Sequence, residues 1–251
     1  MNVSPMWRGL IASIQFLTII PCGPTGVFQA HKTLPFFPLC GLIIGGLLVA
    51  ADYLGALIWP PEVVSAVNVL FLVVITGALH LDGLADTADG LYGRRPPQRA
   101  LEIMKDSRVG AIGVIAVICC LGIKWAGLSA IQVYRPLWLL IIPALSRATV
   151  MFAVHVLPYG RPDGGTGHSF FERRLKLADY WPLGVPAAIM LWITPWGFVW
   201  AVTATVSITA SILLFYRVKI NCVTGDMLGA MIEVTESGLF LVFAAVNRLL
   251  Y

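Results

Sequence analysis

Long apolar stretches constrain this chain more than any other feature of its sequence. They cover residues 36–59, 63–84, 109–131, 137–157, 182–216 and 227–250. A helix needs roughly 20 apolar residues to cross about 30 Å of hydrocarbon, so each stretch is long enough to span a membrane. Residues 182–216 are too many for one span, and the turn signal at residues 194–197 (TPWG) divides them into two helices. We therefore predict an all-α, polytopic membrane helix bundle of about seven transmembrane helices, forming a single transmembrane domain over residues 1–251.

A shorter apolar stretch, residues 7–20, precedes these spans and ends at the sequence PCGP. About 14 residues are too few to cross a bilayer alone and are typical of a helix that lies in the interface. A cleaved signal peptide is the alternative, but Arg8 is the only basic residue ahead of the stretch and no small-residue cleavage site follows it. We expect a short, uncleaved N-terminal interfacial helix.

Basic residues predict the orientation, because positively charged loops beside membrane spans stay in the cytoplasm. With seven spans, one set of loops contains twelve lysines and arginines, and the opposite set contains only Arg135 and Arg248. The twelve are Lys32, Arg94, Arg95, Arg99, Lys105, Arg108, Arg161, Arg173, Arg174, Lys176, Arg217 and Lys219. The sequence thus predicts a bacterial inner-membrane protein whose twelve-residue face is cytoplasmic and whose C-terminus is outside.

Three of the thirteen acidic residues lie within residues 80–90 (HLDGLADTADG). On a helix Asp82, Asp86 and Asp89 would share one face, and such carboxylates repel one another unless a cation lies among them. Oxygen ligands of this kind are what Mg²⁺ prefers, together with substrate phosphates. The alternative is a helix end wetted by cytoplasmic water. The predicted place of Asp82 near the end of a span favours a reaction at the membrane surface over a transporter site at mid-membrane.

A second acidic group lies in residues 224–236 (TGDMLGAMIEVTE), at the start of the last span. Asp226 would begin the helix, and Glu233 and Glu236 would lie roughly 10 to 15 Å deeper. Charges at that depth mark functional sites unless they are paired. An ion pair with Arg147 is the alternative, and we expect it to account for one glutamate only.

Basic side chains follow the first acidic group along the chain. Lys105 and Arg108 lie in residues 102–110 (EIMKDSRVG), and we expect them to contact a substrate diphosphate. Arg94, Arg95 and Arg99 are typical of anchors to anionic lipid. The glycine-rich residues 159–170 are a weak signal for phosphate binding, since the spacing and the lysine of a P-loop are missing.

Residues 80–90 and 102–110 closely resemble cobalamin synthase, the adenosylcobinamide-GDP ribazoletransferase family. Residues 224–230 with Glu236 resemble the family's C-terminal motif, and residues 15–18 (QFLT) resemble its N-terminal one. One departure is that two glycines usually precede the Thr-Gly-Asp element, whereas Asn221 and Cys222 precede Val223 here.

The resemblance implies a Mg²⁺-dependent enzyme that joins adenosylcobinamide-GDP to α-ribazole or its 5′-phosphate and releases GMP. Metal-binding and catalytic roles are expected for Asp82, Asp86, Asp89 and Asp226. Glu236 or Asp89 would accept the hydroxyl proton. Substrate-binding roles are expected for His80, Lys105, Arg108, Thr224, Gly225 and Glu233.

Two other functions fit parts of the pattern. A CDP-alcohol phosphotransferase also places aspartates at the inner membrane surface, but its motif has Asp-Gly-x-x-Ala-Arg where this chain has Asp-Gly-Leu-Ala-Asp-Thr. A cation-coupled transporter would use Glu233 and Glu236 as its ion site. The expected partners are the small-molecule substrates and the lipid bilayer, with no nucleic acid, and either a second copy of the chain or other cobalamin-assembly enzymes.

Overall fold

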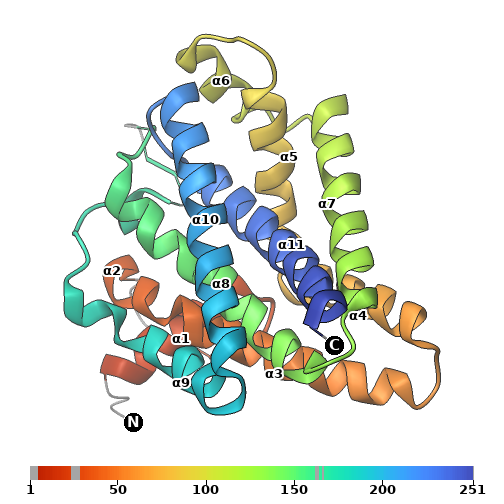
Figure 1. The fold of residues 1–251 in the computed structure, drawn as a ribbon. Helices are drawn as coiled ribbons and strands as arrows, with labels where there is room; N and C mark the ends of the chain where they lie inside the picture. The colour runs from red at the N-terminus through yellow and green to blue at the C-terminus, as the bar shows by residue number, and fades with distance from the viewer. Residues whose placement is uncertain (1–4, 24–28, 162–163, 166, 251) are drawn as a thin grey trace.

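A computed structural model of the chain describes residues 5–23, 29–161, 164–165 and 167–250 (Figure 1). These residues form helices joined by turns and one isolated bridge between Tyr159 and Val223, with no strand among them. The α-helices are α1 (Pro5–Leu17), α2 (Ala30–Thr33), α3 (Phe37–Ala56), α4 (Pro61–Ile75), α5 (Leu79–Leu91), α6 (Pro97–Ile103), α7 (Ala111–Ala130), α8 (Arg135–Val156), α9 (Gly184–Ile193), α10 (Pro195–Lys219) and α11 (Gly225–Leu250). Three 3₁₀ turns are η1 (Leu34–Phe36), η2 (His168–Phe170) and η3 (Leu177–Leu183).

Five helical segments within the described residues are long and apolar enough to cross a membrane. They are α7, α8, α10, α11 and the segment Ala30–Ala56, which contains α3. A sixth crossing is formed if α4 and α5 count as one bent span. The all-α multi-pass class and the short N-terminal helix are confirmed, but the count of about seven is not reached.

The bend between α4 and α5 is the main departure from the predicted spans, because residues 63–84 were expected to form one straight helix. The two helices meet at 88°, and both Gly77 (φ 58°) and Ala78 (φ 56°) adopt left-handed backbone conformations. The end of the α1 segment holds this break, since the Ile19 amide donates to the Ile75 carbonyl at 2.9 Å. The acidic residues 82–89 therefore lie on a separate helix that is turned away from the apolar one.

The predicted turn at residues 194–197 is confirmed. Thr194 caps α10 by accepting a hydrogen bond from the Gly197 amide at 3.1 Å, and Pro195 occupies the first helical position. The preceding α9 has only 10 residues, about 15 Å of helix, which is too short for a span on its own. This short helix is the reason that the predicted seventh span is missing.

Helix α11 runs through the middle of the bundle and contacts α5, α7, α8 and α10 (Figure 1). Glycines allow the closest approaches: a Cβ on Gly127 of α7 would lie 2.8 Å from the Phe240 backbone of α11. In α3, Gly41 and Gly45 face the α8 backbone in the same way. Small residues at helix contacts are typical of membrane bundles, where close packing replaces the hydrophobic effect.

Several of the basic segments gather at one end of the bundle, near the label of α6 in Figure 1. The Lys219 ammonium at the end of α10 donates to the Leu91 and Gly93 carbonyls at 3.2 and 2.8 Å. The Arg161 guanidinium donates to the Met104 carbonyl at 3.1 Å. Arg161 and Lys219, which the charge pattern assigns to one face of the membrane, thus both contact the segments around α6.

Candidate active site

The two acidic motifs meet where α5 packs on α11. A Cβ on Gly83 would lie 2.6 Å from the Asp226 carbonyl oxygen and 3.0 Å from its Cα, so only glycine permits this contact. One turn deeper, a Cβ on Gly229 would lie 3.3 Å from the Cα of His80. The glycines between the acidic residues therefore set the distance between the helices that carry them.

Three carboxylates and one arginine gather at this contact. The charges of Asp82, Asp226, Arg161 and Asp89 all act on Asp86. Arg161 donates a hydrogen bond to Oδ2 of Asp226, and the Thr224 hydroxyl lies 3.4 Å from the same oxygen. Among the described residues, no side chain or amide bonds the carboxylates of Asp82 and Asp86, so their oxygens are available to a cation or a substrate.

Asp89 has a different position from the other aspartates. Its carboxylate accepts hydrogen bonds from the Gly110 amide at 2.7 Å and the Gly113 amide at 2.9 Å. These amides open α7, where a negative side chain is stabilised by the free N–H groups and the helix dipole. Asp89 therefore fixes the start of α7 to α5.

The predicted set of four metal-binding aspartates is not assembled. Among the described residues no three His, Cys, Asp or Glu side chains lie close enough to hold a metal ion by themselves. Asp89 accepts backbone hydrogen bonds, and Asp226 is paired with Arg161. Asp82 and Asp86 are the members of the set whose carboxylates have no partner among the described residues.

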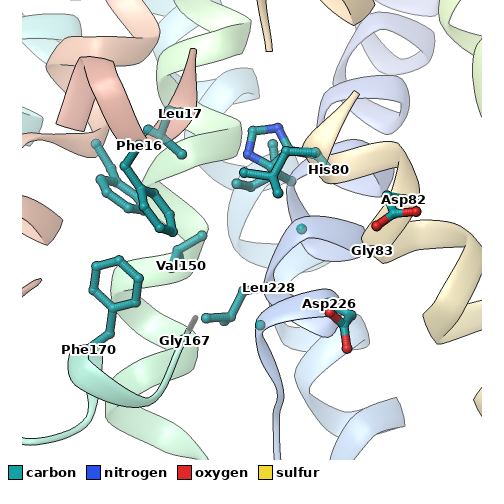
Figure 2. A pocket seen from close by; sticks show the side chains of 15 residues that line it. Phe16, Leu17, His80, Asp82, Gly83, Val150, Gly167, Phe170, Asp226 and Leu228 are labelled. Carbon is teal, nitrogen blue, oxygen red and sulfur yellow. The ribbon is translucent and has the colours of Figure 1, made fainter. Parts of the chain in front are cut away.

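A cavity of about 70 Å³ lies beside Asp82 and Asp226 (Figure 2). Its opposite wall is aromatic, with the Phe170 ring edge-on to Phe16 at 5.3 Å and to Phe37 at 5.5 Å. Figure 2 shows the aromatic side chains facing the two aspartates across the cavity, with His80 between the two sides. The site thus combines an apolar, aromatic wall with an acidic wall.

His80 lines this cavity and is 3% exposed. Neither of its ring nitrogens has a hydrogen-bond partner, although Nδ1 lies 3.9 Å from Oε1 of Glu233. A buried imidazole without partners is costly. It is placed to bond a group that enters the cavity.

Glu233 and Glu236 lie deeper, in a buried ionic network. Lys124 of α7 donates to Oε2 of Glu233 at 2.7 Å and to Oε1 of Glu236 at 2.8 Å. Arg147 and Ser146 of α8 bond the second oxygen of Glu236. Two positive and two negative side chains are therefore paired, which offsets the cost of burying each charge in the bundle.

This network corrects the expectation that ion pairing could account for only one glutamate. Lys124 provides a second buried cation, so both glutamates are neutralised. Glu236 is 0% exposed and does not line the cavity. The geometry favours a structural role for Glu236 over proton transfer, and it gives no support to a transporter ion site.

Lys105 and Arg108 lie at the same end of the bundle but do not line the cavity. Arg108 is 88% exposed and bonds Asp106 at 2.6 Å. These hydrogen bonds lower the pKa of the Asp106 carboxyl to about 2, so the pair stays charged throughout the neutral range. Arg161 is the cation that pairs with a cavity-lining aspartate among the described residues.

Sequence reasoning missed Arg161, Lys124 and the aromatic wall. Arg161 lies in the glycine-rich loop, and its signal was a single arginine in a loop predicted to share a face with the aspartates. The Lys124 signal was a lysine inside an apolar span, at a depth where a counter-charge is needed. Phe16 lies within the N-terminal motif at residues 15–18.

The unusual residue before the C-terminal motif keeps a backbone shape typical of glycine. Asn221 has φ 54°, in the left-handed region that glycine adopts freely and asparagine tolerates. Three residues later, Thr224 is fully buried. Its hydroxyl lies 3.4 Å from the Met227 amide near the start of α11. Gly225 lines the cavity. Asn221 therefore adopts this left-handed conformation without a glycine at that position.

Comparison with known proteins points to one family. The sequence profile described as cobalamin-5-phosphate synthase matches residues 9–244. An adenosylcobinamide-GDP ribazoletransferase of Desulfitobacterium hafniense is 38% identical over 92% of this chain and 94% of its own length. Proteins of the same name from Syntrophobacter fumaroxidans and Alkaliphilus metalliredigens are each 35% identical, over 92% and 93% of this chain and 96% and 93% of their own lengths. No solved structure matches the chain.

Proposed function

The chain belongs to the cobalamin-5-phosphate synthase family, and we propose that it is an adenosylcobinamide-GDP ribazoletransferase. It joins adenosylcobinamide-GDP to α-ribazole, or to the 5′-phosphate, in cobalamin synthesis and releases GMP. The observation that carries this proposal is the contact of Gly83 with Asp226, which brings two acidic motifs to one cavity. We place the enzyme in the bacterial inner membrane with this cavity open to the cytoplasm, on the strength of the basic loops at the same end.

We propose that Mg²⁺ is held by Asp82 and Asp226. Magnesium sites commonly use one or two protein carboxylates and complete their shell with water and substrate phosphates. The partial set of free carboxylates fits that chemistry, and the pairing of Asp226 with Arg161 keeps its charge balanced without the ion. When bound, the ion would neutralise the diphosphate and make its phosphorus more electrophilic.

The chain's own residues are arranged for a phosphoryl-type transfer. A hydroxyl oxygen of ribazole forms a bond to the phosphorus that stays linked to cobinamide, and the bond to the bridging oxygen breaks, so that GMP leaves with the bonding electrons. Arg161 compensates the negative charge that develops on the leaving phosphate. The aromatic wall formed by Phe16 and Phe170 offers an apolar surface to the flat base of ribazole.

Asp86 is our candidate for the group that accepts the hydroxyl proton. The two earlier candidates have other partners: Glu236 is bonded to Lys124 and Arg147, and Asp89 caps α7. Asp86 is a half-buried carboxylate that lies among the charges of the site. A positioned base contributes typically 10² to 10⁴ in rate. An Asp86→Asn protein that kept near-parental turnover would remove this assignment.

The proposed function is tested with the purified chain, adenosylcobinamide-GDP and each of the two acceptors, with and without Mg²⁺. We expect equal amounts of GMP and a cobalamin product, and no product after chelation of the ion. Release of CMP from a CDP-alcohol instead would identify a different phosphotransferase. Association with further copies or with other cobalamin-assembly enzymes stays a prediction.

A further inference from the structure

A second cavity, of about 390 Å³, lies between the N-terminal segment and the residues that lead into η3. None of its lining residues also lines the cavity beside the aspartates. The two are neighbours, because Phe36 lines the second cavity and Phe37 lines the first. We call the second one the basic cavity, after the residues that face it: His31, Lys32, Arg173 and Arg174.

The charges of the basic cavity are not balanced. Lys32, Arg173 and Arg174 form no ion pair with any described residue. Asp179 is the only acidic residue in the lining, and its Oδ2 accepts a hydrogen bond from the Lys176 amide at 2.7 Å. Cations that face one hollow repel each other unless an anion lies between them. The lining therefore fits a ligand that carries a negative charge.

The walls of the basic cavity are fixed by packing. Gly9 of α1 lies against Lys32 and Phe36, since a Cβ there would be 2.5 Å from the Lys32 carbonyl oxygen and 2.6 Å from the Phe36 ring. The Phe36 ring lies edge-on to Trp181 at 6.1 Å. Segments far apart in the sequence are thus held together around the cavity.

Apolar side chains around the basic cavity are exposed. Met6 and Trp181 line it and are 52% and 50% exposed, and Trp7 and Leu177 beside them are 55% and 91% exposed. Tryptophan is typical of the boundary between the hydrocarbon and the head groups of a membrane. A ligand that combines an anionic group with an apolar part would match both the basic lining and these apolar side chains.

We propose that the basic cavity binds the phosphate of an anionic phospholipid, with the acyl chains lying along the exposed apolar residues. Basic pockets at membrane boundaries recognise such head groups, and the planar guanidinium groups of Arg173 and Arg174 match phosphate oxygens. Bound lipid would also hold α1 and η1 in place. Helix α1 carries Phe16, and η1 directly precedes Phe37; both side chains line the cavity beside Asp82 and Asp226.

The test measures phospholipid retention by the purified full-length chain in neutral detergent, using native mass spectrometry with phosphatidylglycerol or phosphatidylcholine. We expect the parent to retain phosphatidylglycerol in preference to phosphatidylcholine. The Arg173→Gln/Arg174→Gln protein should bind phosphatidylglycerol about 30-fold more weakly, because it lacks two positive charges near the membrane surface. The matched control is Arg217→Gln/Arg248→Gln, which removes two exposed arginines that do not line the cavity. We expect the control to bind within twofold of the parent.

Three outcomes would overturn the proposal: equal loss in both double variants, no preference for phosphatidylglycerol, or full displacement of the lipid by millimolar glycerol phosphate or GMP. The last would mean that the cavity binds a free phosphate ester. If the Arg173→Gln/Arg174→Gln protein does not fold, Lys32→Gln replaces it, with an expected loss of about fivefold and the same control.

Discussion

Removal of the Lys124 charge tests the buried ionic network. In a Lys124→Met protein the Glu233 carboxylate loses its 2.7 Å partner, and Glu236 keeps only Arg147 and Ser146. Lys124 is 2% exposed and Glu233 4%, so water cannot replace the lost hydrogen bonds. Breaking a buried ion pair by removing one partner costs about 3 to 5 kcal/mol. We expect a loss of that size in the free energy of unfolding.

The companion variant is Lys124→Met/Glu233→Gln, which removes both charges of one pair. Because no unpaired charge is left, we expect it to regain most of the lost stability. Unfolding in mixed detergent micelles with rising dodecyl sulfate measures both variants, and Arg99→Gln is the control for loss of an exposed charge. GMP release by the double variant should stay within about fivefold of the parent. A Lys124→Met protein as stable as the control, or a stable double variant without activity, would refute the structural role of the network.

Three further predictions concern the site. Arg161→Gln should lower kcat about 100-fold, the typical effect of losing one charge-stabilising donor. Arg108→Gln should keep kcat within twofold of the parent, and equal losses in the two variants would contradict the roles given to the two arginines. Asp89→Asn should lower the free energy of unfolding by about 1 kcal/mol, since one acceptor of the α7 cap is lost. The same change should leave the Mg²⁺ concentration for half-maximal GMP release unchanged. A higher Mg²⁺ requirement would restore Asp89 to the metal site. Gly83→Ala should separate α5 from α11 and abolish most GMP release. In the control Gly122→Ala no atom lies within 4 Å of the new Cβ, so GMP release should be unchanged. An active Gly83→Ala protein would argue against the close contact.

The sequence predicts those features that depend on local chemistry. The apolar stretches predict the membrane class, the TPWG turn predicts the start of α10, and the spacing of Asp82, Asp86 and Asp89 predicts a shared helix. The predicted single face is only partly realised, because Asp89 turns to the amides of α7. Which carboxylate a distant helix end will approach is set by packing, and nothing in residues 80–90 encodes it.

The remaining features arise from contacts between distant segments. The break before α5 has apolar residues on both sides and no proline, and it is held by the hydrogen bond from Ile19 to Ile75. Likewise, the pairing of Lys124 with both glutamates depends on the positions of α7 and α11. An accounting of buried charges would have predicted that partner, since two glutamates in the membrane need two cations.

We propose that Asp82 of α5 and Asp226 of α11 act on one divalent cation. The most direct test of this shared site is electron paramagnetic resonance of Mn²⁺ bound to the purified protein in the presence of adenosylcobinamide-GDP. The parent should bind Mn²⁺. Asp82→Asn and Asp226→Asn should each weaken Mn²⁺ binding at least tenfold and should also reduce GMP release. The control Asp179→Asn should bind Mn²⁺ like the parent. Parental Mn²⁺ affinity in either the Asp82→Asn or the Asp226→Asn protein would contradict the shared site.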